Sequence, residues 1–366
     1  MLNIETPAVI IDMEQVERNL RRYQQCADLH GCALRPHTKT HKMVRLAKMQ
    51  MGFGAKGVCC AKLSEAEVMA AGGIDDIFVA YPVIGREKIE RFLALSRQIR
   101  IICGVDSIEG ASALSDAAAA HGQRAEVRIE LDTGYARAGV QRDEILEFAK
   151  RVSEMPGLDL GGIFTFKSAT LAGKPTLDLR AAAEEEGRLL SETAELLRSN
   201  GIPIRDVSGG STPTGELVAA YPGITEIRPG TYIFQDVSEL RQGVAEPEEC
   251  CAVVKVTVVS TPTPYRAVID GGSKVFAADK KPMTPPVNLP GFGRIVGHDE
   301  LIFDHMNEEH GVIVRNDAPT GLKVGDILYI VPNHVCTTMN LFDFVYLREK
   351  DGSYTRTRVD GRGRVW

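Results

Sequence analysis

Short apolar runs alternate with amphipathic stretches over most of the first 235 residues. The runs have the length of buried β-strands and fall near residues 32–35, 57–61, 76–80, 100–104, 125–131, 159–166, 205–208 and 225–228. The segments between them, such as 86–95, 108–121 and 177–199, repeat their apolar residues with the period of a helix. Eight strand–helix units in succession predict an α/β fold, a closed (β/α)8 TIM-like barrel rather than an open doubly wound sheet.

The pattern changes near residue 245. Short β-rich runs between Pro and Gly turns replace the helical period, at 251–260, 266–269, 293–296, 312–314, 327–331 and 344–347. We therefore expect a barrel domain over 1–240 and an all-β domain over 241–366. Residues 1–12, with the strand-like run Pro7 to Asp12, either close the barrel floor or pair with the second domain.

Composition narrows the possible partners. The chain has 366 residues, more than one compact core usually holds, and a net charge of −6, which argues against nucleic acid as a partner. No apolar stretch is long enough to span a bilayer, and no signal peptide is recognisable at the start. The eight cysteines lie mostly in apolar runs, as expected for reduced thiols in a cytoplasmic protein. We expect a small-molecule substrate.

A lysine follows the first predicted barrel strand, in the stretch Arg35-Pro36-His37-Thr38-Lys39-Thr40-His41-Lys42. Barrel enzymes carry their reactive groups at this end of their strands. Apolar walls and positive neighbours would disfavour the charged form of Lys39, leaving an amine that can hold an aldehyde cofactor as a Schiff base. From these residues alone, a solvated basic loop is the alternative.

Two glycine-containing loops follow the seventh and eighth predicted strands, Gly209-Gly210-Ser211-Thr212 and Pro229-Gly230-Thr231-Tyr232. Barrels commonly bind phosphate at these loops, because glycines let backbone N–H groups approach the anion. A phosphate site together with a reactive lysine suggests pyridoxal 5'-phosphate. Two ordinary glycine turns are the alternative.

Arg137 follows the fifth predicted strand and can direct its guanidinium into the barrel mouth. A cation beside the cofactor's pyridine ring would leave the ring nitrogen unprotonated and weaken its action as an electron sink. A surface position or a contact with the substrate carboxylate is the alternative.

A histidine and a cysteine two positions apart, His334 and Cys336, close a predicted strand of the second domain. In an extended segment both side chains leave the same face, and imidazole plus thiolate is a ligand pair that suits zinc. Two protein ligands leave positions for water and substrate, as a catalytic metal site requires. A buried cysteine beside a histidine with other partners is the alternative.

The stretch from Arg35 to Lys42, together with Gly57-Val58-Cys59-Cys60-Ala61-Lys62, Gly209 to Thr212 and Pro332-Asn333-His334-Val335-Cys336, resembles the D-threonine aldolase and D-serine dehydratase family. The resemblance runs nearly end to end and keeps the order of the motifs. It implies an alanine racemase-like, fold-type III enzyme that depends on pyridoxal phosphate and a divalent metal. It also implies a homodimer.

The resemblance assigns roles to individual residues. Lys39 would be the catalytic lysine that carries the cofactor, with Arg137 beside the ring. His334 and Cys336 would bind the metal, zinc in the first instance and manganese or magnesium otherwise. The remaining cofactor-binding residues would be His37, Gly209, Gly210, Ser211, Thr212 and Tyr232.

Two reactions of D-β-hydroxy-α-amino acids share this machinery. Aldol cleavage gives glycine and an aldehyde, whereas dehydration of D-serine or D-3-hydroxyaspartate gives a 2-keto acid and ammonia; the metal polarises the β-hydroxyl in both. Cys336 resembles the dehydratases, while residues 227–232 and 333–340 resemble the aldolases, and we rank the aldolase first. Aldolases often carry a further histidine that takes the hydroxyl proton. None occurs between His121 and His305, so a metal-bound hydroxide, His310 or Lys167 would have to substitute.

Two other kinds of function are less consistent with the sequence. A racemase needs a second base facing Lys39, for which Tyr265 is the obvious candidate, and it would leave His334 and Cys336 unexplained. A non-catalytic cofactor carrier of this fold type is generally a single barrel, and the segment 245–366 argues against it.

Overall fold

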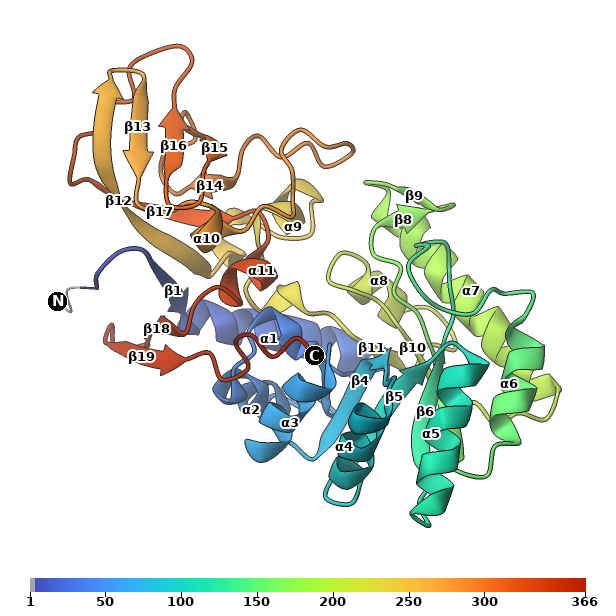
Figure 1. The fold of residues 1–366 in the computed structure, drawn as a ribbon. Helices are drawn as coiled ribbons and strands as arrows, with labels where there is room; N and C mark the ends of the chain where they lie inside the picture. Colours follow the sequence, from blue (N-terminus) through green and yellow to red (C-terminus); the bar gives the residue numbers. More distant parts are fainter. Residues whose placement is uncertain (1–3) are drawn as a thin grey trace. The chain divides into compact units, whose positions relative to one another are not determined.

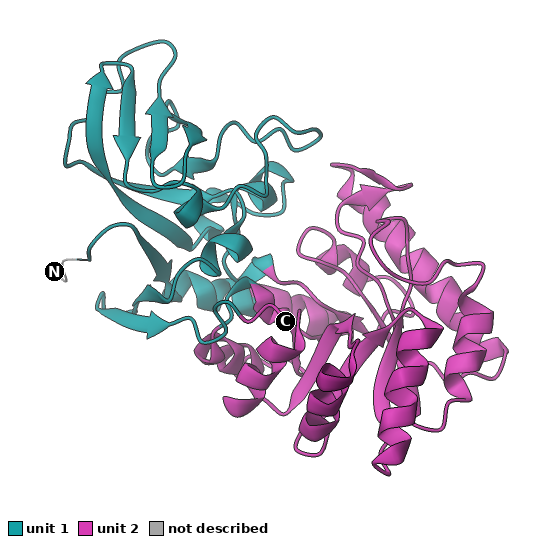
Figure 2. Cartoon of the chain, in the orientation of Figure 1, with its two compact units in different colours: residues 1–21, 40–42, 231–363 teal, residues 22–39, 43–230, 364–366 magenta. Residues whose placement is uncertain are grey.

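The computed structural model describes residues 4–366, and these divide into two compact units (Figure 2). The β-rich unit contains residues up to 21, 40–42 and 231–363, and the barrel unit contains 22–39, 43–230 and 364–366. The sequence places the boundary at residue 240, whereas the units divide between Gly230 and Thr231. The three residues after Lys39 also belong to the β-rich unit.

Eight parallel strands form the sheet of the barrel unit, and each matches one of the expected apolar runs (Figure 1). Their order along the sheet is β2-β11-β10-β7-β6-β5-β4-β3. The strands are β2 (Ala33–Leu34), β3 (Val58–Cys60), β4 (Asp76–Pro82), β5 (Arg100–Val105), β6 (Ala125–Glu130), β7 (Leu158–Phe164), β10 (Asp206–Gly209) and β11 (Glu226–Ile227).

Backbone contacts between the first and last strands of this order close the sheet. The Lys56 N–H donates to the Leu34 carbonyl at 2.9 Å, and a parallel bridge joins His37 to Cys59. The predicted closed barrel is therefore confirmed. Since the strands are parallel, their carboxyl ends, where β10 ends at Gly209 and Lys39 follows β2, lie at one end of the barrel.

The helices of the barrel unit bury one apolar face each. α7 begins after Asp178, whose carboxylate accepts the Ala181 N–H, and its core-facing residues recur every three or four positions. The helices are α2 (Val44–Gly52), α3 (Leu63–Ala71), α4 (Arg86–Ser96), α5 (Ile108–Ala120), α6 (Ile145–Ser153), α7 (Leu179–Ser199) and α8 (Gly215–Ala219). A short hairpin, β8 (Thr170–Leu171) with β9 (Lys174–Pro175), precedes α7.

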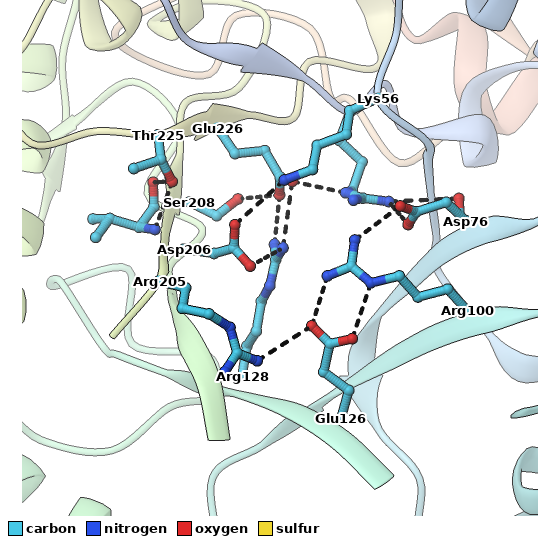
Figure 3. A network of polar contacts seen from close by, with 12 residues as sticks. Lys56, Asp76, Arg100, Glu126, Arg128, Arg205, Asp206, Ser208, Thr225 and Glu226 are labelled. Atoms are coloured by element: carbon cyan, nitrogen blue, oxygen red, sulfur yellow. Dashed lines mark hydrogen bonds and ion pairs between the residues drawn. The ribbon is translucent and has the colours of Figure 1, made fainter. Parts of the chain in front are cut away.

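A network of charged side chains extends from the interior of the barrel to its surface (Figure 3). Glu226 is fully buried and accepts hydrogen bonds from Arg35 at 2.8 Å, Arg128 at 2.5 Å and the Ser208 hydroxyl at 2.7 Å. Burial disfavours its charge, but the two arginines lower the pKa of Glu226 well below its usual value. The barrel thus contains an ionised carboxylate that its partners hold in place.

A nine-stranded sheet forms the β-rich unit, in the order β15-β16-β13-β12-β1-β18-β19, with β17 pairing β12 and β14. β1 (Ala8–Asp12) pairs antiparallel with β12 and parallel with β18, so the opening segment joins the far end of the chain and does not close the barrel floor. The other strands are β12 (Ala252–Thr263), β13 (Arg266–Ile269), β14 (Gly293–Ile295), β15 (Ile302–Met306), β16 (Gly311–Val314), β17 (Ile327–Pro332), β18 (Phe344–Arg348) and β19 (Tyr354–Arg358).

The remaining helical segments are short, apart from the one that follows β1. α1 (Met13–Leu29) packs Val16, Leu20 and Tyr23 inward. The other segments are α9 (Val237–Arg241), α10 (Ser273–Phe276), α11 (Val335–Met339) and the 3-10 turns η1 (Thr38–Thr40), η2 (Thr231–Ile233) and η3 (Pro247–Glu249). No helix within residues 4–366 is long and apolar enough to cross a membrane.

Candidate functional site

Lys39 lies in the 3-10 turn η1, just past the carboxyl end of β2, and is partly buried. The residues before it are anchored. Thr38 is fully buried and donates its hydroxyl to Glu65 Oε1 at 2.6 Å, and the His37 ring faces the Lys39 N–H at 3.5 Å. The turn therefore holds the lysine backbone while its long side chain can extend from the strand end.

Phe166, in the loop after β7, brings together the lysine and the predicted arginine. The Lys39 Nζ lies 5.4 Å from the centre of the Phe166 ring, and the Arg137 guanidinium carbon lies 4.5 Å from it. Tyr135 packs edge-on against the same ring at 5.0 Å. Two cations on one aromatic ring form a partly apolar, positively charged surface suited to a planar anionic ligand.

The Arg137 side chain is 53% exposed, and one of its nitrogens lies 3.8 Å from Glu130. Burial raises the pKa of Glu130, and the positive charge of Arg137 opposes that rise. At this distance the contact is a loose ion pair, so the arginine keeps donors for a bound group.

The glycine loop after β10 is fixed by a buried glutamate that the sequence did not single out. Glu186 accepts the Gly210 N–H at 2.8 Å and the Thr214 hydroxyl at 3.1 Å. Burial raises the pKa of Glu186, and these hydrogen bonds oppose the rise. Gly210 has φ +66°, and a Cβ there would lie 3.0 Å from the Gly215 backbone, so the turn requires glycine.

A second residue that sequence reasoning missed is Arg228, directly after β11. It is 7% exposed and donates to the Ser208 hydroxyl and to the Thr165 carbonyl, both at 2.5 Å. Burial lowers the pKa of Arg228. The sequence could have indicated this residue, because an arginine directly after an apolar strand is expected to be buried, and charged residues are rarely buried without a structural or functional reason.

Lys167 does not remain available as a base. Its side chain is fully buried, its Nζ pairs with Glu185 at 2.5 Å, and it also donates to the Thr170 carbonyl. The other substitute for the missing histidine, His310, is exposed in the turn between β15 and β16.

In the β-rich unit, His334 and Cys336 lie at the start of α11, directly after β17. The His334 Nδ1 faces Asp279 Oδ2 at 2.5 Å. Burial disfavours the imidazolium, but the neighbouring Cys336 sulfur and the Asp279 hydrogen bond raise the pKa of His334 to about 10. The two predicted ligands therefore lie together, with an additional carboxylate on the histidine.

Cys336 also contacts two threonines, each of which is next in the chain to a predicted site residue, Lys39 or Tyr232. The Cys336 Sγ lies 3.1 Å from the hydroxyl of Thr40, which follows Lys39 directly, and 3.6 Å from that of Thr231. Thr231 precedes Tyr232, whose side chain is fully buried in η2.

These residues fit both groups that the sequence suggests. The barrel unit offers an amine, an aromatic ring with a second cation, and a tight glycine loop in which a Cβ at Gly209 would lie 2.7 Å from Leu190. Imidazole and thiolate form a soft pair. Two protein ligands would leave a bound ion with open positions, as at a catalytic site. Among residues 4–366 no group of three or more His, Cys, Asp or Glu side chains is placed to hold a metal.

Fold and site together define a barrel followed by a β domain, with a lysine just past the carboxyl end of a barrel strand and a histidine–cysteine pair in the β domain. Two family models match in succession, "Alanine racemase, N-terminal domain" at residues 11–238 and "Putative serine dehydratase domain" at residues 251–348. The chain belongs to this family of pyridoxal phosphate-dependent lyases, as the sequence resemblance implied.

Similar proteins span the whole chain. A D-threonine aldolase of Arthrobacter sp. is 32% identical over 94% of this chain and 89% of its own length. A D-serine dehydratase of Dictyostelium discoideum is 26% identical over 95% and 94%. Alanine racemase structures at 13–18% identity, with TM-scores of 0.63–0.66, share the fold alone.

A solved D-threo-3-hydroxyaspartate dehydratase is also similar, with a TM-score of 0.89, 32% identity and coverage of 98% of each chain. This structure is a variant in which a cysteine is replaced by alanine, described as the metal-free form. Another structure of the same enzyme replaces a histidine two positions earlier. The spacing equals that of His334 and Cys336.

Proposed function

We propose that this chain is a lyase of D-β-hydroxy-α-amino acids that uses pyridoxal phosphate and a divalent metal, zinc in the first instance. The observation that carries the proposal is the contact of Cys336 with Thr40, the residue next to Lys39. It supports a role for the lysine and the proposed metal ligands in one reaction.

Each residue has a role that follows from its chemistry. When bound, the cofactor would supply an electron sink for the substrate's Cα and the metal a Lewis acid for its β-hydroxyl. Lys39 would hold the cofactor and then accept the substrate's Cα proton at Nζ. The loop Gly209–Thr212 and Tyr232 would bind the phosphate. His334 Nε2 and Cys336 Sγ would hold the ion.

Around the ring, Phe166 would pack against the cofactor, and Arg137 would bind its ring edge or the substrate carboxylate. Both roles depend on the shared contact of the two cations with one aromatic ring. His37, facing the Lys39 N–H, would hold the backbone of the turn. These assignments require no movement of Lys167, which its ion pair keeps away from catalysis.

Of the two possible reactions, dehydration agrees better with the available groups. It requires a base at Cα and a Lewis acid at the hydroxyl, which Lys39 and the pair His334–Cys336 would provide. Aldol cleavage also requires an acceptor for the hydroxyl proton. The ion pair of Lys167 removes one of the three candidates and leaves only the metal site and His310. This reverses the order suggested by sequence. Aldol cleavage is the second candidate, favoured by the relatives named as aldolases.

Product analysis distinguishes the two reactions. Purified protein reconstituted with pyridoxal phosphate and zinc is incubated with D-threonine, D-serine and D-threo-3-hydroxyaspartate. Keto acid and ammonia in equal amounts support dehydration, whereas glycine and an aldehyde support aldol cleavage. Absence of both products from all three substrates, in protein that carries both groups, would contradict the proposed function.

A further inference from the structure

A buried carboxylate holds the backbone between the two proposed metal ligands. Asp236 is 1% exposed, and its Oδ2 accepts the N–H of Val335, the residue between His334 and Cys336, at 3.1 Å. Its Oδ1 accepts the Glu239 N–H at 3.1 Å and caps α9. One side chain therefore joins the first turn of α9 to the ligand segment.

A second contact from the same turn fixes the other side of the histidine. The Ser238 hydroxyl donates to the Asn333 carbonyl at 2.7 Å, and the Asn333 side chain donates to the Gly291 carbonyl at 2.6 Å. The backbone is thus held both before and after His334.

The helix cap alone does not require a charged residue at position 236. Capping α9 uses one acceptor oxygen, and serine or asparagine would serve as well as aspartate. A buried carboxylate is costly unless all of its hydrogen bonds are made, and its second oxygen is committed to the Val335 N–H. The backbone contact is therefore what distinguishes Asp236 from an ordinary cap.

We propose that Asp236 is a positioning residue that sets the separation and direction of the His334 and Cys336 side chains, so that both bind one divalent ion. The inference rests on the proposed function, in which this pair holds the metal. It adds a residue that contacts neither metal nor substrate and acts through the backbone between the ligands.

Cobalt(II) reports the geometry of such a site directly, because thiolate coordination produces an intense charge-transfer absorption. In Asp236→Asn the cap oxygen can be kept while the amide nitrogen faces the Val335 N–H. Loss of a group that orients a ligand typically weakens metal binding 10- to 100-fold. We expect a loss of about that size for zinc and cobalt, measured by competition with a chelator, and a weaker or shifted cobalt–thiolate band.

Val335→Pro removes the same hydrogen bond from its donor side. Val335 is the first residue of α11, where proline is tolerated, and His334 before it is extended at φ −141° and ψ 100°. We expect the same direction of change in affinity and spectrum. Because both substitutions break one contact, their combined effect should be smaller than the product of the two.

Asp178 provides a matched control. It caps α7 by accepting the Ala181 N–H and contributes nothing to the ligand segment. Asp178→Ala should lower stability as a lost cap does, with cobalt affinity and spectrum unchanged. Circular dichroism of every variant establishes that it is folded, and if Asp236→Asn is not, Val335→Pro and Ser238→Ala decide the question.

The outcomes separate this inference from the proposed function. Wild-type affinity and an unchanged cobalt band in folded variants of Asp236 and Val335 would overturn the positioning role. Cobalt binding that survives Cys336→Ala unchanged would overturn both the proposed metal site and the inference. A cobalt site that responds to Asp236→Asn in a protein without lyase activity would overturn the proposed function alone.

Discussion

Replacing Glu226 by glutamine tests the charged network inside the barrel. The substitution keeps the size of the side chain but removes the charge that Arg35 and Arg128 share. Both arginines are fully buried, and each retains one other carboxylate, Asp76 at 2.6 Å and Asp206 at 3.0 Å. Removing one partner of a buried ion pair costs about 3–5 kcal/mol, and the retained carboxylates place Glu226→Gln near the lower value, at about 3 kcal/mol.

The single tryptophan, Trp366, reports the unfolding of the barrel unit, to which it belongs. Its carbonyl accepts the Ser64 hydroxyl at 2.6 Å. A loss of about 3 kcal/mol corresponds to a decrease of roughly 6–12 °C in the melting temperature of a domain of this size. Thermal and urea unfolding followed by tryptophan fluorescence measure the change.

Glu192→Gln is the matched control, because Glu192 also accepts from two arginines, Arg142 at 2.5 Å and Arg188 at 3.2 Å, but at the surface. Exposed ion pairs contribute less than about 1 kcal/mol. A Glu226→Gln variant that loses no more stability than Glu192→Gln would refute the reasoning.

The charge of Glu226 also makes the stability of the fold depend on pH, in a direction that its pKa determines. Because the folded-state pKa of Glu226 lies below its unfolded value, its charge stabilises the fold fully above the unfolded pKa. This contribution is lost as the pH falls through the folded-state pKa. The stability difference between wild type and Glu226→Gln should therefore be constant between pH 5 and 8 and decrease below about pH 4.

Four further predictions concern the site. Purified protein should be yellow and Lys39→Ala colourless, as absorption spectroscopy will show; a colourless wild type supplied with pyridoxal phosphate contradicts this. Chelation should abolish turnover without bleaching, and full activity after verified metal removal contradicts it. Lys167→Met should lower stability by about 1.5–3 kcal/mol, since it removes the ion pair with Glu185 and a hydrogen bond to the Thr170 carbonyl, without changing the product ratio; a selective loss of aldehyde would make Lys167 catalytic. Asp279→Asn should weaken zinc binding about 10-fold in chelator competition, and unchanged affinity contradicts its contact with His334.

Much of the fold could be predicted because apolar periodicity is a local property. All eight barrel strands overlap the expected runs, with ends that differ by at most two residues, and α5, expected over 108–121, spans Ile108–Ala120. The strands β15 and β19 were not expected. β19 reads Tyr-Thr-Arg-Thr-Arg and lies at the edge of its sheet with mostly exposed side chains, so no apolar run marks it.

The site was less predictable because its supporting residues are ordinary in their local context. Three consecutive glutamates on α7 look like one solvated surface. In the structure Glu184 is exposed, Glu185 pairs with Lys167, and Glu186 is buried beneath the glycine loop. Whether each glutamate is exposed, paired or buried depends on how the helix is rotated against the barrel. No sequence motif predicts this rotation. Lys39 and the glycine loop could be singled out because each directly follows a predicted barrel strand, where such enzymes carry their functional groups.

The pairing of β1 constrains the order in which the chain can reach its final form. This strand leaves the ribosome well before its two neighbours, β12 and β18, which begin at Ala252 and Phe344. The barrel can form while both edges of β1 still lack a partner. For most of translation the apolar segment Ala8–Ile11 is therefore unpaired and exposed to solvent. Nascent chains halted before residue 252 should therefore be the ones that require a chaperone to stay in solution.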